Sequence, residues 1–413
     1  MTVHAELKAD RVIPTKAAWP AKDAAPASDL TEMRTRIAAL KPVLRARAAH
    51  AEAQRRPDDE AWMAIRDTGI FRAFVPKKYG GLELDPREFV DLVLPLSEGC
   101  PSTGWVAAFC VEHNWLLANF PEQAQDETFG RQSYVIAPAV TVPPGKARPV
   151  PGGFRLDGRW RWGTGIMHAD WVIASAFIEG GNGPDMAMFL MPATDVDVPD
   201  TWRMDGMAAT GSHDLVVRDL FVPEHRMVRS GPMRDGRGPA SKFYTSPLYR
   251  MPMAPFLAST AAISAIGAAK ATVELTRERL GGHTKMGSDA KQSEKPASQL
   301  RLARAETMTR TAELLIRDAL AATWALGDLE GPAQLRGRIA TRAQIAYAVG
   351  LCRHAILLLC EAGGSSVHQL DNPLQRMLRD VNVISSHIVF DEDVAFEQHG
   401  RSMLGLPPNS MLV

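Results

Sequence analysis

Cysteine, net charge and the short motifs that bind nucleotides or metals are all scarce in this sequence. Its four cysteines form no CxxC pair and no Cys/His cluster with the spacing of a zinc site (Cys100, Cys110, Cys352 and Cys360). There is no secretory signal and no apolar run long enough to cross a bilayer. We therefore expect free thiols in a cytoplasmic protein that does not bind a membrane.

The charges balance, because 47 Lys and Arg residues are matched by 47 Asp and Glu residues. This balance gives no indication of the basic groove that a nucleic-acid partner requires. Neither a GxGxxG turn nor a GxxxxGK[ST] loop is present, which excludes a Rossmann or P-loop nucleotide site, and no HExxH or EF-hand pattern indicates a metal. Ser212, His213 and Asp214 are triad residue types, but neighbours on a strand point to opposite faces and cannot converge.

Apolar residues make up 46% of the 413 residues, enough for a large core divided among two or three subdomains. Helical spacing at both ends of the chain flanks a middle part with strand-like alternation. We expect an α+β fold with a flexible tail at 1–27, an N-terminal α-helical domain at 28–133, an antiparallel, β-barrel-like domain at 134–245 and a helical bundle at 246–413. The bundle is predicted to hold four long helices, near 252–280, 297–327, 333–362 and 373–404.

Local signals predict several element boundaries. Asp29 followed by Glu32 is a capping box that starts the first helix. Asp371 or Asn372, followed by Pro373, starts the last predicted helix. Within the strand-rich part, Asp157-Gly158 and the glycine-rich run 180–183 predict two hairpin turns.

Two histidines are the candidate catalytic residues. Trp105, Phe109 and His113 recur every four residues in the helix that begins near Pro101, so their side chains share one side. His387 falls on or beside the apolar face of the last predicted helix, and Asp391 one turn later could set its tautomer and pKa. A core histidine satisfied by a neighbouring group would explain either position without catalysis.

Five blocks of sequence carry a family resemblance. In chain order they are GIFRAFVPKKYGGLELDPREF, STGWVAAFCVEHNWLL, WRWGTGIMHADWVIAS, GMAATGSHDLVVRDLFVPEHR and RDVNVISSHIVFDED. Together they resemble the flavin-dependent monooxygenases of the acyl-CoA dehydrogenase fold, above all the oxygenase components of two-component aromatic hydroxylases of the p-hydroxyphenylacetate hydroxylase kind. The resemblance covers the chain from about Asp29 to Gly405. It implies an N-terminal helical domain, a central β domain and a C-terminal four-helix bundle.

The resemblance also implies an activity. A separate NAD(P)H:flavin reductase would supply reduced flavin, FMNH2 or FADH2, and O2 would react with it to give a C4a-(hydro)peroxyflavin that hydroxylates a small aromatic or phenolic substrate. Such an adduct survives only where water is excluded, which suits an apolar pocket with a few placed hydrogen-bond donors. The family implies a homotetramer in which neighbouring subunits complete the flavin site.

Carried over residue by residue, the resemblance assigns three catalytic roles. Thr164 stands where the family usually has serine, with its hydroxyl near the flavin N5. His387 matches a histidine beside the oxygen-reacting carbon, and His113 matches a substrate-side histidine that binds or deprotonates a phenol. The other implied flavin contacts are Trp105, Trp162, Gly165, Gly363, Gly364 and Arg379, and the other implied substrate contacts are Phe109, Arg250 and Phe256.

Other functions stay open at this point. An N- or S-oxygenase would use the same cofactor chemistry on a different acceptor atom. An acyl-CoA dehydrogenase needs a carboxylate base, which many such enzymes carry in a Tyr-Glu-Gly-Thr segment late in the chain. Here the corresponding stretch reads ISSHIVFDEDV, although the first bundle helices could hold a base. A non-enzymatic helical scaffold would leave both histidines structural and would not bind reduced flavin.

Overall fold

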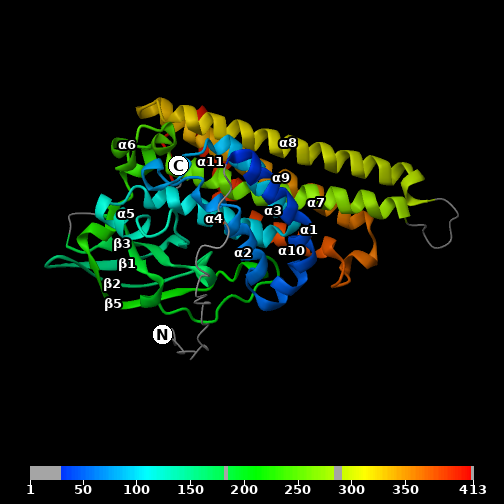
Figure 1. Ribbon diagram of the computed structural model, residues 1–413. Helices are drawn as coiled ribbons and strands as arrows, with labels where there is room; N and C mark the ends of the chain where they lie inside the picture. Colours follow the sequence, from blue (N-terminus) through cyan, green and yellow to red (C-terminus); the bar gives the residue numbers. More distant parts are fainter. Residues whose placement is uncertain (1–28, 181–184, 283–290, 411–413) are drawn as a thin grey trace, which may run out of the picture.

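The computed structural model describes residues 29–180, 185–282 and 291–410, which form a helical part, a β-sheet and a long helical bundle (Figure 1). The predicted tail at 1–27 lies outside these residues. The predicted helix start is confirmed with Asp29 as its N-cap, since the Asp29 side chain accepts a hydrogen bond of 2.9 Å from the backbone N–H of Glu32. The N-terminal helices are α1 (Leu30–Gln54), α2 (Asp59–Asp67), α3 (Pro86–Gly99), α4 (Pro101–Leu117) and α5 (Glu122–Thr128).

The described strands form one six-stranded sheet in the order β5-β2-β1-β3-β4-β6. The prediction of a purely antiparallel domain is wrong at one pair, because β1 and β3 run parallel. The chain makes a hairpin from β1 to β2 and then crosses to the far side of β1, so residues 161–170 form a crossover segment between β2 and β3. The strands are β1 (Ala139–Val150), β2 (Gly153–Trp160), β3 (Trp171–Ile178), β4 (Met186–Pro192), β5 (Leu215–Pro223) and β6 (Met227–Arg229).

The hairpin turn predicted at Asp157-Gly158 is wrong. Both residues lie inside β2, and the chain reverses at Pro151-Gly152, where Gly152 has φ +80°. The pairing of β2 with β5 is irregular between Leu156 and Gly158, so this turn-forming dipeptide is accommodated within the strand as a bulge-like irregularity. The second hairpin is confirmed as the antiparallel pair β3 and β4, although positions 181–183 of its predicted turn lie outside the described residues.

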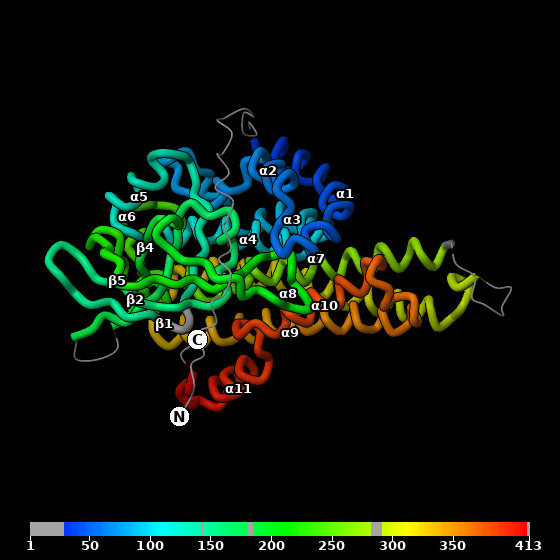
Figure 2. The backbone as a smooth tube through the Cα atoms, turned by 90° about the horizontal axis from the view of Figure 1, so that it is seen from below, coloured from blue at the N-terminus to red at the C-terminus, as the bar shows by residue number. Residues whose placement is uncertain are grey.

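Three of the four predicted long helices are confirmed: α7 (Met253–Gly282), α8 (Pro296–Leu326) and α9 (Gly331–Ala362). They run together and extend beyond the N-terminal helices (Figure 2). The fourth prediction is wrong, because α10 (Pro373–Ser385), a 3₁₀ turn η11 (Ile388–Phe390) and α11 (Glu392–Met403) replace one helix. The break arises where the side chains of His387 and Asp391 accept hydrogen bonds from the N–H groups that begin the next segments.

The α7 and α9 helices correct a further expectation. By length and composition alone, the stretches Met253–Gly281 and Gly331–Ala362 could cross a membrane, although we had expected no such run. Within the fold, 83% of the most apolar stretch of α7 and 61% of the most apolar stretch of α9 are buried. Both helices pack against each other and against α8, so their apolar residues serve the bundle core.

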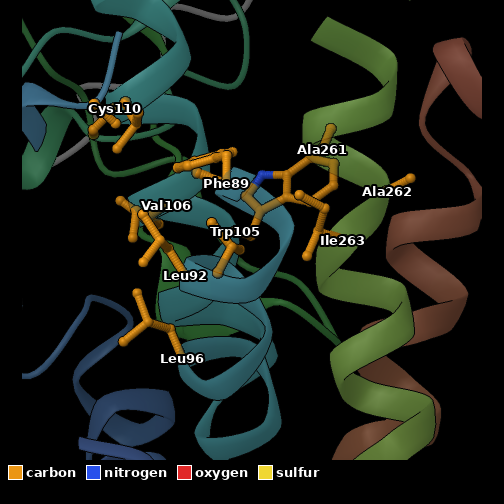
Figure 3. Packing of buried hydrophobic residues seen from close by; sticks show 14 of the residues in the cluster. Phe89, Leu92, Leu96, Trp105, Val106, Cys110, Ala261, Ala262 and Ile263 are labelled. Carbon is orange, nitrogen blue, oxygen red and sulfur yellow. The ribbon is translucent and has the colours of Figure 1, made fainter. Parts of the chain in front are cut away.

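The core places α4 at the centre of the molecule. Almost every residue of α4 is buried, so protein surrounds this helix on all sides. All four cysteines lie in the described part of the chain and are buried as free thiols. Figure 3 shows the packing of α4 with α3 and α7, with Phe89, Leu92, Leu96, Trp105, Val106, Cys110, Ala261, Ala262 and Ile263 in one apolar cluster.

Candidate functional site

A row of aromatic side chains on α4 meets the break between α10 and η11. The rings of Trp105 and Phe109 stack with centroids 4.5 Å apart, and Phe109 contacts His113 edge-on at 5.5 Å. His387 packs edge-on against Trp105 at 5.7 Å, and Phe390 closes the group at 6.0 Å from His387. We call these five residues the aromatic cluster. The predicted shared face of the α4 residues is thus confirmed, and the two candidate histidines lie in the same cluster.

The tautomer of His113 follows from its partner. Its Nδ1 lies 2.6 Å from the backbone oxygen of Ala137, and a carbonyl oxygen can only accept, so Nδ1 carries the proton. The Nε2 atom then presents a lone pair. The ring is only 3% exposed, and this burial lowers the pKa of His113 to about 4, while the bond to Ala137 acts in the opposite direction. His113 is therefore a neutral hydrogen-bond acceptor at pH 7.

The sequence analysis missed a buried carboxyl group beside His113. Oε1 of Glu112 lies 3.9 Å from Nε2 of His113, and the hydroxyl of Thr260 on α7 donates to Oε2. Burial raises the pKa of Glu112 well above its usual value, because loss of hydration disfavours the charged form. Its place as the one acidic residue among the apolar and aromatic residues of this helix was the signal that could have identified it.

His387 has the opposite tautomer. Its Nδ1 accepts a hydrogen bond of 3.3 Å from the N–H of Val389, so a neutral ring carries its proton on Nε2. Loss of hydration lowers the pKa of this partly buried ring to about 4. Asp391 does not orient the ring as expected, because its carboxylate instead caps α11 by accepting from Val394. His387 thus offers an N–H donor, and His113 offers an acceptor.

The crossover segment brings Thr164 against α4. Gly165 has φ +97°, and a Cβ at this position would lie 2.8 Å from Sγ of Cys110. Only glycine permits both this backbone conformation and this close approach. Thr164 is 7% exposed, and its hydroxyl lies 2.9 Å from that of Ser212. Gly165, the residue after Thr164, and His387 therefore contact the same helix, Gly165 beside Cys110 and His387 beside Trp105 and Phe109.

The segment also offers a surface for a planar group. Trp162 has φ +68° and is 54% exposed, so the described residues leave much of its indole uncovered. A partly free indole two residues from a buried hydroxyl is complementary to a flat ring with an apolar face and a polar edge. An isoalloxazine has this character, so Trp162 and Thr164 fit a flavin. Within the described ranges, no group of three or more His, Cys, Asp or Glu residues could hold a metal ion.

A second group of predicted flavin contacts lies at the other end of α10. Arg279 of α7, which the sequence analysis did not select, donates to the backbone oxygen of Gly363 at 3.2 Å. Gly364 has φ +67°. A surface cavity of ≈ 340 Å³ adjoins this loop and is lined by Leu275, Arg279, Gln369, Asp371, Asn372, Pro373 and Leu374. Arg379, in contrast, is paired with Glu52 of α1 at 2.5 Å.

Two predicted substrate contacts do not reach the aromatic cluster. Phe256 is fully buried, and its ring packs between Phe74 and Trp115 at 5.4 and 5.0 Å. Arg250 pairs with Asp328, beyond the end of α8, at 3.2 Å. The sequence spacing could not reveal this, because both residues lie at the start of the bundle and only the packing decides which way they face.

Asp380 is a second buried carboxyl group that the sequence analysis left without a role. Its Oδ1 accepts from the backbone N–H of Met207 at 2.5 Å, and its Oδ2 accepts from the hydroxyl of Ser102 at 3.4 Å. Burial raises the pKa of Asp380 to about 6, partly offset by the bond from Met207. The residue ties α10 to α4 and to the loop that precedes β5.

Comparisons with known proteins place this geometry in a family context. The patterns "Acyl-CoA dehydrogenase, N-terminal domain" and "Acyl-CoA dehydrogenase, C-terminal domain" match residues 29–132 and 259–392. A pigment production hydroxylase of a Rhodococcus species is 36% identical over 93% of this chain and 99% of its own. The flavin-dependent monooxygenase oxygenase subunit HsaA of Rhodococcus jostii is 32% identical over 92% and 100%. The structure of XiaF from a Streptomyces species in complex with FADH2 superimposes with a TM-score of 0.84 and 32% identity, covering 92% and 96%.

Proposed function

The chain belongs to the flavin-dependent monooxygenases of the acyl-CoA dehydrogenase fold, and on that premise we propose that it is the oxygenase component of a two-component aromatic hydroxylase. A separate NAD(P)H:flavin reductase supplies the reduced flavin, FMNH2 or FADH2. The "oxygenase subunit" in one relative's name and the FADH2 bound to another support this assignment. The sequence has no nucleotide-binding motif with which to reduce a flavin itself.

The observation that carries the proposal is the pair of neutral histidines with opposite tautomers on one aromatic cluster. Reduced flavin, when bound, supplies the electrons that activate O2, and one oxygen atom passes to the substrate. Trp162 and Thr164 would hold its ring, by apolar contact and by a hydrogen bond. The rings of Trp105, Phe109 and Phe390 keep water away, which protects an oxygen-transfer reaction from wasteful loss of hydrogen peroxide.

The two histidines have different hydrogen-bonding roles. Nε2 of His113 accepts the hydroxyl proton of a phenol, because Nδ1 is already committed to Ala137. The Nε2–H of His387 would be the group that donates to an oxygen atom in the site, because its Nδ1 is held by the N–H of Val389. A small phenol fits this arrangement, since it offers a flat apolar ring and one acidic hydroxyl. A thioether substrate of an S-oxygenase, in contrast, has no proton to donate to the acceptor at His113.

A dehydrogenase is less well supported. That reaction needs an ionised carboxylate to remove a carbon-bound proton, but burial disfavours the ionised form of Glu112, and Asp380 accepts a hydrogen bond from the backbone N–H of Met207. On α7, the only carboxylates are Glu274 and Glu278 near its C-terminal end, and Glu274 is paired with Lys41 at 2.9 Å. We also propose a homotetramer, in which a neighbouring subunit adds to the flavin site near Gly363 and Gly364.

A single-turnover experiment tests the proposal. Chemically reduced FMN or FAD is bound to the purified protein without air and mixed with oxygenated buffer that contains a simple phenol. We expect hydroxylated phenol only when protein and reduced flavin are both present. Failure to bind either reduced flavin would contradict the proposal. If a fatty acyl-CoA reduced the bound oxidised flavin, the dehydrogenase would be favoured instead.

A further inference from the structure

Three hydroxyl groups form a buried chain that ends at Thr164. The Thr210 hydroxyl donates to the backbone oxygen of Met207 at 2.9 Å, and the Ser212 hydroxyl lies 2.9 Å from Oγ1 of Thr210. The Ser212 hydroxyl in turn lies 2.9 Å from Oγ1 of Thr164. Each of the three residues is at most 7% exposed, so water does not compete for these bonds. Only Thr164 stands at an open end of the chain.

The number of protons on the three hydroxyl groups fixes the direction of the hydrogen bonds between them. Each hydroxyl has one proton, and a carbonyl oxygen can only accept. The Thr210 hydroxyl donates its proton to the backbone oxygen of Met207, so Ser212 must donate to Thr210. Thr164 must then donate to Ser212. The Thr164 oxygen is then left with lone pairs for any further partner. A threonine hydroxyl alone could equally donate or accept, but this chain makes Thr164 an acceptor.

The carbonyl that sets the direction is itself held in place. Met207 has φ +53°, a left-handed conformation that is uncommon for a residue with a side chain. Asp380 binds its N–H at 2.5 Å, and the indole N–H of Trp202 donates to its oxygen at 3.1 Å. A Cβ on the preceding Gly206 would lie 2.1 Å from the backbone oxygen of Arg379, so the loop is pressed against α10. The backbone oxygen of Met207 therefore cannot turn away from Thr210 without disturbing the contact between this loop and α10.

We propose that Ser212 and Thr210 are positioning residues that orient the Thr164 hydroxyl, so that the site selects reduced over oxidised flavin. This inference rests on the proposed function. The N5 atom of a reduced flavin carries a proton and donates, whereas N5 of an oxidised flavin can only accept. An acceptor at Thr164 is thus matched to the reduced form that a reductase delivers, and it is mismatched to the oxidised form that must leave.

The test is the ratio of the dissociation constants for oxidised and reduced flavin, measured anaerobically on the full-length protein. The Ser212→Ala variant frees the Thr164 proton, so we expect the preference for reduced flavin to fall roughly three- to tenfold, in line with one hydrogen bond. A merely structural loss would weaken both redox states equally and leave the ratio unchanged. The Ser175→Ala variant is the matched control, because Ser175 is equally buried in β3 and its hydroxyl makes no hydrogen bond in the described structure.

A second variant keeps the inference testable if Ser212→Ala fails to fold. Thr164→Ser retains the hydroxyl and should retain the ratio, whereas Thr164→Val should reduce it as far as Ser212→Ala does. An unchanged ratio in a folded Ser212→Ala or Thr164→Val protein overturns the inference while the proposed function stands. If the unaltered protein binds no reduced flavin, the proposed function fails, and this inference fails with it.

Discussion

The substitution His113→Asn separates the two tasks of that imidazole. An asparagine amide can still donate to the backbone oxygen of Ala137, which His113 contacts at 2.6 Å, so the buried carbonyl keeps a partner. The variant has no basic nitrogen at the position of Nε2. We therefore expect a folded protein with unchanged affinity for reduced flavin and a specific loss of hydroxylation.

The pKa of the ring decides at which stage His113 can take the proton. A phenol with a pKa of about 10 would transfer its proton to His113, whose pKa is about 4, at a cost of roughly 8 kcal/mol. The imidazole therefore does not hold the proton in the resting complex and acts only while the oxygen bond forms. A positioned general base of this kind contributes about 10²- to 10⁴-fold. We expect the hydroxylation rate to fall by that factor, with hydrogen peroxide released instead.

The assay is single-turnover product analysis, in which hydroxylated phenol and hydrogen peroxide are both quantified per flavin oxidised. His168→Asn is the matched control. His168 is also 3% exposed, and burial also lowers its pKa, but it stacks on Trp62 and pairs with Asp59 instead of joining the aromatic cluster. The control should keep the product yield of the unaltered protein.

The pH dependence gives a second measurement on the same residue. Because burial lowers the pKa of His113 to about 4, the ring is neutral at every pH above about 5. Hydroxylation should therefore be independent of pH down to about pH 5 and should fall as the pH approaches 4. A midpoint near the ordinary histidine value, or a product yield in His113→Asn within twofold of the unaltered protein, would refute the reasoning.

Three further predictions concern the surroundings of the cluster. His387→Ala removes the Nε2–H donor, so hydrogen peroxide per flavin oxidised should rise while the melting temperature stays within a few degrees. Gly165→Ala places a methyl group 2.8 Å from Sγ of Cys110 and an alanine at φ +97°. Denaturant titration should show that the free energy of unfolding falls by about 2–3 kcal/mol. The double variant with Cys110→Ala should recover the part that comes from the clash but not the part that comes from the backbone conformation. Asp380 has a folded pKa of about 6 against an ordinary 3.8, so the unfolded state releases its proton first as the pH rises. The stability of the unaltered protein relative to Asp380→Asn should fall by up to about 3 kcal/mol between pH 4 and 6, and constant relative stability would contradict the assigned burial.

Periodicity and capping chemistry carried most of the fold prediction. The N-cap at Asp29 and the three long helices α7, α8 and α9 depend largely on interactions within a few residues. Such signals can be read from one sequence because both partners are close along the chain. The wrong predictions arise where the interacting residues are far apart along the chain. Asp157-Gly158 has the composition of a turn, but pairing with β5 absorbs it into β2.

The break at His387 shows how a local preference is overruled. Helical spacing continues through residues 373–404, but two side-chain caps end α10 and restart the chain as η11 and α11. The bend turns His387 toward Trp105 and Phe109 instead of leaving it on a helix face. Asp391 does not orient the His387 ring as predicted, because its carboxylate caps α11.

By itself, the sequence determined the order of helical and strand-rich parts, the shared face of Trp105, Phe109 and His113, and the blocks that carry the family resemblance. The tertiary structure was needed to show that Gly165 and His387 contact one helix, that Phe256 and Arg250 lie elsewhere, and that the carboxyl group of Glu112 is buried beside His113. It also decided the tautomers of both histidines and the direction of the hydroxyl chain. The physical reason is that burial and hydrogen-bond partners set protonation and orientation, and these partners come from residues far apart along the chain.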